Sequence, residues 1–346
     1  MPVDDPASAP PSDRSAPRRE ARWIELSPEA SQRSFAEAVR EGIGQDPKTL
    51  PSQFFYDAEG SALFEEICEL PEYYLTRAET EILNAHSGDL ARDLSEIETL
   101  VELGSGSATK TEILLRAFEG DGRTLAYAPI DVSRSALEAS VERLESRHPE
   151  LEVLPAHAEY EAGLEAITKR PFGPKLLLWL GSSIGNLTRR AAAGFLAGIG
   201  RRMASEDRML VGIDLRKDRE TLERAYDDSR GVTARFDLNL LARINRELGG
   251  RFDLDRFRHR VHYDEGTGSV RSYLESRVDQ RVRVDALDLE VSFAEGERIH
   301  TEDSHKYSPD EIDDLARQAG LRLERRRYDG QRRFALVLFA AASCPA

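Results

Sequence analysis

Apolar and polar positions follow two alternating periods through the middle of the chain. Between residues 99 and 214, short apolar runs of strand length are separated by segments with the three-to-four-residue spacing of amphipathic helices. We expect strands at residues 100–103, 124–132, 151–156, 175–180 and 209–214, and helices at 111–118, 133–146, 162–168 and 189–203. Such alternation predicts an α/β fold with a doubly wound, largely parallel sheet.

The alternation breaks after residue 214. Residues 219–248 have a mostly helical pattern, whereas the segments 260–263, 269–278 and 281–286 alternate as antiparallel strands do. A further helix is expected to open at Ser308, with Pro309 at its first position, and to end near Gly320. The last segments, 321–328 and 331–340, then predict a hairpin around Asp329-Gly330.

The residues before the sheet add two helices and a tail. We expect a helix at 29–42, and another from Thr76, as the N-cap with Glu79 three residues on, to about residue 94. Residues 1–21 hold five prolines and almost no large apolar side chains, which predicts a disordered tail. We therefore divide the chain into the tail, a core domain of residues 80–214 plus 308–346, and a smaller α+β domain of residues 22–79 plus 215–307.

A glycine turn joins the first strand of the sheet to its helix. Gly104 and Gly106 would let the backbone approach a ligand closely, and a helix N-terminus favours an anionic or nucleotide ligand. A dinucleotide fingerprint would need a third glycine at Thr109. Glu102 stands two residues before Gly104, and Asp131 ends the next strand, where it could hydrogen-bond ribose hydroxyls. Acid-x-Gly-x-Gly is similar to the S-adenosylmethionine (SAM) loop of class I methyltransferases.

Charge and composition exclude several other classes of function. The net charge of −15 argues against sequence-independent binding to nucleic acid, which requires a basic surface. Two cysteines, Cys68 and Cys344, give no disulfide framework, which suits a cytoplasmic protein. There is no apolar run long enough to cross a bilayer, so we expect no membrane partner. We expect no metal either, since the pair His157 and Glu159 lacks a third ligand.

Five ordered motifs resemble those of a known family, the histidine-specific, SAM-dependent methyltransferases, from about residue 50 to residue 340. The motifs are Phe55-Tyr56-Asp57, Leu70-Pro71-Glu72-Tyr73-Tyr74-Leu75-Thr76-Arg77-Ala78-Glu79, Glu102-Leu103-Gly104-Ser105-Gly106, Gly185-Asn186-Leu187 and Thr301-Glu302-Asp303-Ser304. The resemblance implies a class I SAM-methyltransferase, Rossmann-like core with a second, substrate-binding domain. It also implies trimethylation of the α-amino group of L-histidine to hercynine, a step toward ergothioneine, by a monomer.

The resemblance assigns two sets of residues to the site. SAM would be bound by Glu102, Gly104, Ser105, Gly106, Lys110, Asp131, Glu159 and Tyr160. L-histidine would be bound by Tyr56, Tyr73, Gly181, Asn186, Tyr226, Ser272, Glu302 and Ser304.

Within the second set, the resemblance gives each group a role. Asn186 and Tyr226 are expected at the α-carboxylate, and Glu302 and Ser304 at the imidazole. Tyr56 is expected beside the reacting amine and is the one candidate catalytic residue. A carboxylate and a hydroxyl two residues apart on an extended segment point to the same face, so they can engage one polar ring together.

Two other functions stay open at this point. The family's histidine enzymes tend to have a methionine where we expect Ser272, and a small residue there leaves room for another amino acid, such as tryptophan, or a related amine. A non-catalytic SAM- or nucleotide-binding module is the third reading. The presence of Tyr56, Asn186, Tyr226 and Glu302 argues against it.

Overall fold

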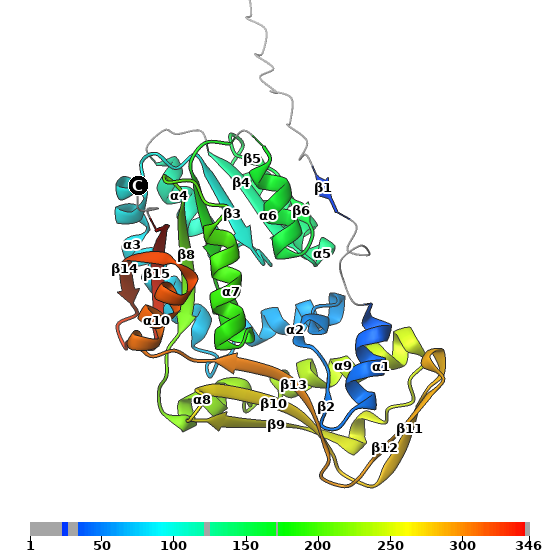
Figure 1. The fold of residues 1–346 in the computed structure, drawn as a ribbon. Coiled ribbons are helices and arrows are strands. Elements are labelled where there is room, and N and C mark those ends of the chain that lie inside the picture. The colour runs from blue at the N-terminus through cyan, green and yellow to red at the C-terminus, as the bar shows by residue number, and fades with distance from the viewer. Residues whose placement is uncertain (1–22, 27–33, 121–124, 171, 343–346) are drawn as a thin grey trace, which may run out of the picture.

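The computed structural model describes residues 23–26, 34–120, 125–170 and 172–342, so the predicted tail at 1–21 lies outside the described residues. The chain forms two bodies, a larger one around a central sheet and a smaller one beneath it in the view of Figure 1. Within the described ranges, no helix has the length and apolar character needed to cross a membrane.

The central sheet of the larger body has the strand order β1-β6-β4-β3-β7-β8-β15-β14, with β5 paired to β4. Its strands run parallel except for β15, which is antiparallel to both β8 and β14. The bounds are β1 Ile24–Glu25, β3 Thr99–Leu103, β4 Ala126–Asp131, β5 Glu152–Val153, β6 Ala156–His157, β7 Lys175–Trp179, β8 Arg208–Asp214, β14 Leu321–Tyr328 and β15 Phe334–Ala341. This is the doubly wound sheet that the alternating pattern predicts.

Helices cover both faces of this sheet. Successive residues of β3 divide between two apolar clusters, Leu100 facing one and Val101 and Leu103 the other, because side chains alternate along a strand. One cluster includes α3, α4 and α5, and the other α6, α7 and α10. Their bounds are α3 Leu75–Asp93, α4 Thr111–Glu119, α5 Arg134–Arg147, α6 Tyr160–Thr168, α7 Arg189–Gly200 and α10 Pro309–Ala319.

The smaller body is built on a four-stranded sheet of order β2-β13-β10-β9 and a separate β11–β12 hairpin. Helices α1, α8 and α9 pack on these strands, and α2 packs on α9 (Figure 1). The bounds are α1 Phe35–Gly44, β2 Lys48–Thr49, α2 Ala58–Cys68, α8 Arg219–Tyr226, α9 Val232–Leu248, β9 Phe257–Asp264, β10 Ser269–Ser276, β11 Gln280–Val284, β12 Leu289–Phe293 and β13 Arg298–His305. Short 3-10 turns occur at η2 Ser52–Phe55, η3 Ser183–Asn186, η4 Leu254–Arg256 and η5 Asp285–Leu287.

Several local predictions are confirmed. Helix α10 begins with Pro309 after the N-cap Ser308 and is followed by Gly320 in the left-handed region, with φ of 63°. The final hairpin pairs β14 with β15.

The structure differs from the predicted strands in several places. The segment 151–156, predicted as one strand, is two short strands, and β12 was not predicted. Strand β1 joins the central sheet through β6, although we assigned residues 22–26 to the smaller domain.

The predicted start of α3 is wrong. Its N-cap is Tyr74 rather than Thr76, and no side chain caps the helix. Glu79, the expected capping-box partner, is fully buried and bonds instead to groups in the centre of the molecule. Tertiary contacts of a buried carboxylate thus replace the local cap that the sequence spacing indicated.

Candidate active site

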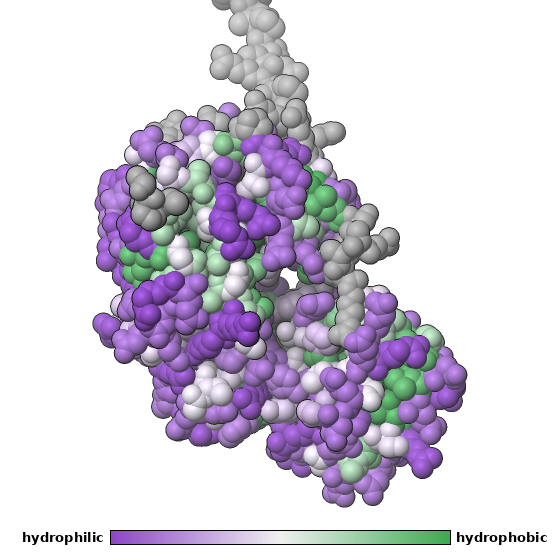
Figure 2. All heavy atoms as spheres, viewed as in Figure 1, coloured by the Kyte–Doolittle hydropathy of each residue, from purple (hydrophilic) through white to green (hydrophobic). Residues whose placement is uncertain are grey.

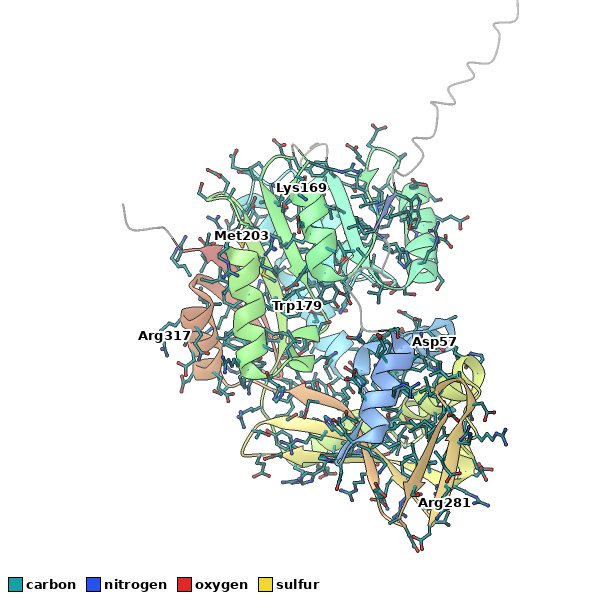
Figure 3. All side chains as sticks on the ribbon, turned by 45° about the vertical axis from the view of Figure 1, so that its right-hand side comes forward. Asp57, Lys169, Trp179, Met203, Arg281 and Arg317 are labelled. Atoms are coloured by element: carbon teal, nitrogen blue, oxygen red, sulfur yellow. The ribbon has the colours of Figure 1, made fainter. Side chains whose placement is uncertain are left out.

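The carboxyl ends of β3, β4, β7 and β8 lie at the edge of the large sheet that faces the smaller body. The turn η3, which follows β7, packs on β13, and Leu215, just after β8, forms a bridge with Tyr307. Figure 3 shows Trp179, the last residue of β7, at this edge and Asp57 across from it on the smaller body. A recess opens between the two bodies in the space-filling view (Figure 2).

The glycine turn after β3 is held by the next strand. The Gly104 N–H donates to the carbonyl of Ile130 at 2.8 Å, and the Gly106 N–H donates to Asp131 Oδ2 at 2.8 Å. The second oxygen of Asp131 accepts the N–H of Ser133 at 2.8 Å. Asp131 therefore braces the loop, and burial raises the pKa of its carboxyl.

Glu102 points into the sheet rather than out of it. Its carboxylate accepts hydrogen bonds from Thr111 at 2.6 Å and from the Tyr127 hydroxyl. Burial raises the pKa of Glu102 to about 7, in spite of both hydrogen bonds and the nearby Lys110 ammonium. The contact with Thr111, the first residue of α4, fixes that helix end beside the loop.

Aromatic rings pack beside the glycine turn on the side of α6. A Cβ built on Gly104, where φ is +73°, would lie only 2.6 Å from the Tyr160 hydroxyl. Tyr160 packs edge-on against Trp179, which lies 4.7 Å from Phe195 between ring centroids. Added bulk at Gly106, where φ is +48°, would meet nothing within 4 Å, so this face of the loop is open. Glu159 is the N-cap of α6, and its side chain makes no capping bond.

A buried carboxylate connects the loop to the strand that follows it in the sheet. Glu79 accepts the Gly181 N–H through both oxygens, at 3.0 and 2.9 Å, and pairs with Lys110 Nζ at 2.5 Å. Burial alone lowers the pKa of Lys110, but Glu79 outweighs it and holds that pKa above its usual value. Two predicted site residues, Lys110 and Gly181, are thus joined by a residue that we had placed in a helix cap.

The smaller body contributes a group of aromatic side chains. Tyr56 packs edge-on against Phe64 and Phe236, with ring centroids 5.6 and 5.8 Å apart, and Tyr73 packs against Tyr226 at 6.1 Å. Burial raises the pKa of Tyr56 well above its usual value, and the charge of Glu302 raises it further. Tyr56 therefore keeps its proton and presents a neutral hydroxyl and ring.

Glu302 and Ser304 lie on one face of β13, as their spacing predicts. Ser304 Oγ is 2.8 Å from the Tyr226 hydroxyl, and Ser272 of β10 stands opposite Glu302 in the sheet register. Glu302 has no hydrogen-bond or ion-pair partner among the described residues. Burial, followed by the charge of Asp237, raises the pKa of its carboxyl to about 7. A carboxylate in this situation is available to a polar ligand.

Asn186 is the last residue of η3, and it is exposed. Its side-chain amide forms no hydrogen bond within the described part of the chain, so it is free to meet a ligand. The preceding Gly185 is tightly packed, because a Cβ there would lie 3.0 Å from the His305 carbonyl and 3.3 Å from Ser304 Oγ. This close approach sets Asn186 next to β13.

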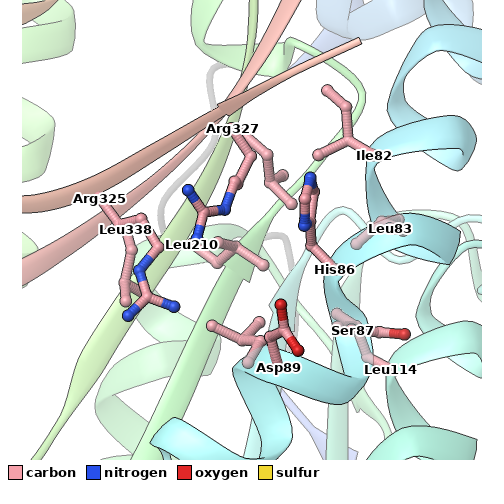
Figure 4. A pocket seen from close by; sticks show the side chains of 12 residues that line it. Ile82, Leu83, His86, Ser87, Asp89, Leu114, Leu210, Arg325, Arg327 and Leu338 are labelled. Carbon is pink, nitrogen blue, oxygen red and sulfur yellow. The ribbon is translucent and has the colours of Figure 1, made fainter. Parts of the chain in front are cut away.

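Two further features lie outside this arrangement. A small hollow between α3, α4 and the β14–β15 side of the sheet is lined by leucines, His86, Arg325 and Arg327 and contains none of the predicted site residues (Figure 4). In the described ranges, no three His, Cys, Asp or Glu side chains are grouped so that they could hold a metal ion.

Sequence reasoning missed Glu79, Asp214 and Lys306 as parts of the site. Lys306 is fully buried and bonds to both Tyr226 and Ser304. The spacing in the sequence could have indicated Lys306, because residues 302, 304 and 306 fall on the same face of an extended segment. No comparable local signal exists for Glu79 or Asp214, which reach their partners across the fold.

Comparisons with known proteins identify the family of this chain. Residues 35–341 match the family model described as "Histidine-specific methyltransferase, SAM-dependent". A histidine N-alpha-methyltransferase of Mycobacterium tuberculosis is 41% identical over 296 residues, covering 86% of this chain and 91% of the relative. Ergothioneine biosynthesis protein 1 of Schizosaccharomyces pombe is 31% identical over 283 residues, covering 79% of this chain but 36% of the longer relative.

Among solved structures, a SAM-dependent methyltransferase from Clostridium acetobutylicum is similar with a TM-score of 0.42 and 11% identity, covering 75% of this chain and 91% of that one. The strand order of the central sheet and the family match over residues 35–341 bear out the class I SAM-methyltransferase fold expected from the sequence. The chain therefore belongs to the family of histidine-specific, SAM-dependent methyltransferases.

Proposed function

We propose that this enzyme transfers methyl groups from SAM to the α-amino group of L-histidine and forms the trimethylated betaine hercynine, in ergothioneine biosynthesis. The observation that carries the substrate assignment is Glu302, a carboxylate that has no hydrogen-bond or ion-pair partner among the described residues and stands two residues before a hydroxyl that contacts Tyr226. The names of the mycobacterial and fungal relatives support the same reaction and pathway.

The residues present fit SAM at the loop after β3. The open face of Gly106 would leave space for the nucleoside, and Asp131, at the end of β4, would hydrogen-bond the ribose hydroxyls. Tyr160 would cover the adenine side, with Glu159 beside it. Lys110, Ser105 and Glu102 would complete the site. Glu102 would act indirectly, through its hydrogen bond with the first residue of α4. SAM supplies an electrophilic methyl group on a sulfonium.

We assign most of the recognition of the amino acid to the smaller body, residues 22–79 plus 215–307 apart from β1 and the start of α3, and the rest to Gly181 and Asn186, which follow β7 of the larger body. Asn186 and Tyr226 would hold the α-carboxylate, and Glu302 and Ser304 the imidazole. Tyr73 and Ser272 would shape the ring pocket, and Gly181 the wall behind the amine. A ligand without a ring N–H would leave Glu302 buried and unpaired, which is the basis of discrimination in such sites.

These residues contribute to the reaction mainly by holding the amine and the methyl donor in place. Methyl transfer is an in-line displacement, and holding the two reactants in place can contribute roughly 7–11 kcal/mol to lowering the barrier. The amine must be neutral to have a lone pair. Tyr56 is a poor base, because burial and Glu302 raise its pKa. We assign to Tyr56 the orientation of the neutral amine and the solvation of its developing positive charge by the ring.

The function is tested by incubating the protein with SAM and a panel of amino acids and measuring mass gains of one to three methyl groups. We expect L-histidine to gain three and to have the highest kcat/KM. L-tryptophan is the necessary comparison, because Ser272 is small and stands opposite Glu302, which could also accept an indole N–H. Preferential methylation of tryptophan would replace histidine in this assignment.

A Tyr56→Phe variant separates positioning from proton transfer. The ring and its contacts with Phe64 and Phe236 remain, and the substitution removes only the hydroxyl group and the hydrogen bond that we assign to it at the substrate amine. We expect kcat to fall by no more than about tenfold, and the rate of both proteins to rise with pH toward the pKa of the substrate amine. A variant that binds histidine and SAM normally but has no activity would instead make Tyr56 the proton acceptor.

We further propose that the enzyme is a cytoplasmic monomer. All of the substrate and cofactor groups named above come from one chain, and Cys68, the cysteine within the described residues, is a free thiol. Sedimentation at micromolar concentration tests the oligomeric state directly.

A further inference from the structure

A fully buried lysine lies directly behind the proposed substrate groups. Lys306 Nζ donates to the Tyr226 hydroxyl at 2.6 Å and to Ser304 Oγ at 2.7 Å, and it pairs with Asp214 Oδ2 at 3.0 Å. Burial by itself lowers the pKa of Lys306, but Asp214 and Tyr226 outweigh it and raise that pKa above the usual value. The side chain is therefore an ammonium, and its three N–H bonds are all used.

Asp214, the partner of this ammonium, is anchored in the larger body at the end of β8. Its carboxylate accepts the Tyr74 hydroxyl at 2.8 Å and the Lys217 ammonium at 2.7 Å. The N–H of the same residue donates to Ser182 Oγ at 2.9 Å. Lys306, the residue after β13 of the smaller body, is thus tied to a hydrogen-bonded group of the larger body.

The ammonium restricts which way the two hydroxyl groups can point. An ammonium only donates, so the Tyr226 and Ser304 oxygens must both accept from Lys306. Their own protons are then directed away from it. The two oxygens are 2.8 Å apart and either hydroxyl can donate to the other. A carboxylate ligand only accepts, so it selects the arrangement in which Ser304 donates to Tyr226 and the Tyr226 proton is left for the ligand. In that arrangement Ser304 keeps one lone pair, which can accept a ring N–H.

We propose that Lys306, held by Asp214, is a positioning residue for substrate recognition: it orients the Tyr226 hydroxyl as a donor toward the α-carboxylate and leaves Ser304 as an acceptor for the ring. This inference rests on the proposed use of L-histidine and adds two residues to it. Lys306 itself does not contact the substrate, since all of its donors are taken within the protein.

A purely structural role for the buried charge pair is the competing explanation. Lys217 provides a matched control, because it contacts the same Asp214 carboxylate but has no contact with Tyr226 or Ser304. If the charge on Asp214 were all that mattered, removing either lysine would have similar consequences. If Lys306 orients the hydroxyl groups, only its removal will change how the substrate is recognised.

The test compares Lys306→Met with Lys217→Met, using calorimetric titration of each protein with L-histidine, with histamine, which has no carboxylate, and with SAM. We expect Lys306→Met to weaken histidine binding roughly 10- to 100-fold, as for a lost hydrogen bond to a charged group. SAM affinity should change less than about threefold, and histamine, which keeps the ring contact with Ser304 but has no carboxylate, should lose clearly less affinity than histidine. Lys217→Met should leave the preference for histidine over histamine within about threefold of the wild type.

Equal losses for histidine and histamine in Lys306→Met, or the same loss of preference in Lys217→Met, would overturn the inference. Should Lys306→Met fail to fold, Tyr226→Phe decides, because it removes the oriented hydroxyl and keeps the ring. Unchanged histidine affinity in Tyr226→Phe overturns the proposal. In a folded double variant, the losses from Lys306→Met and Tyr226→Phe should be far from additive, since both remove one interaction. A wild-type protein that fails to bind histidine contradicts the proposed function instead.

Discussion

A Gly104→Val variant is expected to lose SAM binding by more than 100-fold while keeping its fold. The residue has φ of +73°, a conformation that β-branched side chains rarely adopt, and strain of this kind costs roughly 1–3 kcal/mol. A Cβ there would also lie 2.6 Å from the Tyr160 hydroxyl, so either the ring or the loop has to move. Both belong to the proposed nucleoside site, and isothermal titration with SAM measures the result.

The control for this variant is Gly296→Val. Gly296 also has positive φ, +82°, but a Cβ there meets nothing within 4 Å, and the residue lies in the turn between β12 and β13. Its substitution imposes backbone strain without approaching the glycine loop. We expect a similar fall in thermal midpoint for the two variants but normal SAM affinity in Gly296→Val. Normal SAM affinity in a folded Gly104→Val protein would remove the loop from the cofactor site.

The central sheet could be predicted because its information is local. Strands β3, β4 and β7 are short, largely apolar runs, and the helices between the core strands have amphipathic spacing, so these elements follow from neighbouring residues alone. The same reasoning predicts α10 from Ser308-Pro309 and Gly320. It fails at α3, where Glu79 satisfies a spacing rule but is used by Gly181 and Lys110.

The substrate side could not be assembled from local pattern. Tyr56 and Tyr73 lie in two connecting segments, Tyr226 on α8 and Glu302 on β13, and only the resemblance to a family grouped these four residues from the sequence. The structure brings Tyr73 against Tyr226, and Tyr226 against Ser304. Buried charges such as Asp214 are invisible to sequence patterns, because their partners are chosen by the tertiary fold.

A Glu302→Gln variant is expected to lose most of its histidine affinity and, above pH 7, to be more stable than the wild type. Both effects come from the same carboxylate. In the wild type Glu302 has no partner in the described residues, and burial followed by the charge of Asp237 raises its pKa from the usual 4.5 to about 7. Ionisation of Glu302 therefore destabilises the free enzyme. The charge becomes favourable only when a ligand donates a hydrogen bond to it.

The loss of binding follows from replacing a charged acceptor with a neutral amide. A hydrogen bond to a charged group contributes about 1.5–3 kcal/mol, so histidine kcat/KM should fall roughly 10- to 150-fold. SAM affinity should stay within about threefold, because Glu302 lies on β13 of the smaller body. The matched control is Glu290→Gln on the exposed side of β12, which removes the same charge and should change neither value. Unchanged histidine kinetics in Glu302→Gln would mean that the carboxylate does not contact the substrate.

The gain in stability has a definite pH window. A carboxyl group whose pKa is higher in the folded state than in the unfolded state stabilises the fold below pH 4.5, and that contribution is lost as the pH rises through about 7. The shift corresponds to on the order of 3 kcal/mol. Glutamine cannot ionise, so the free energy of unfolding of Glu302→Gln relative to the wild type should increase between pH 5 and pH 8 and then level off. Urea unfolding without ligand at these pH values measures it. A difference that stays constant with pH would show that Glu302 is ionised at no cost, and its proposed role as a carboxylate held ready for the imidazole would lose its physical basis.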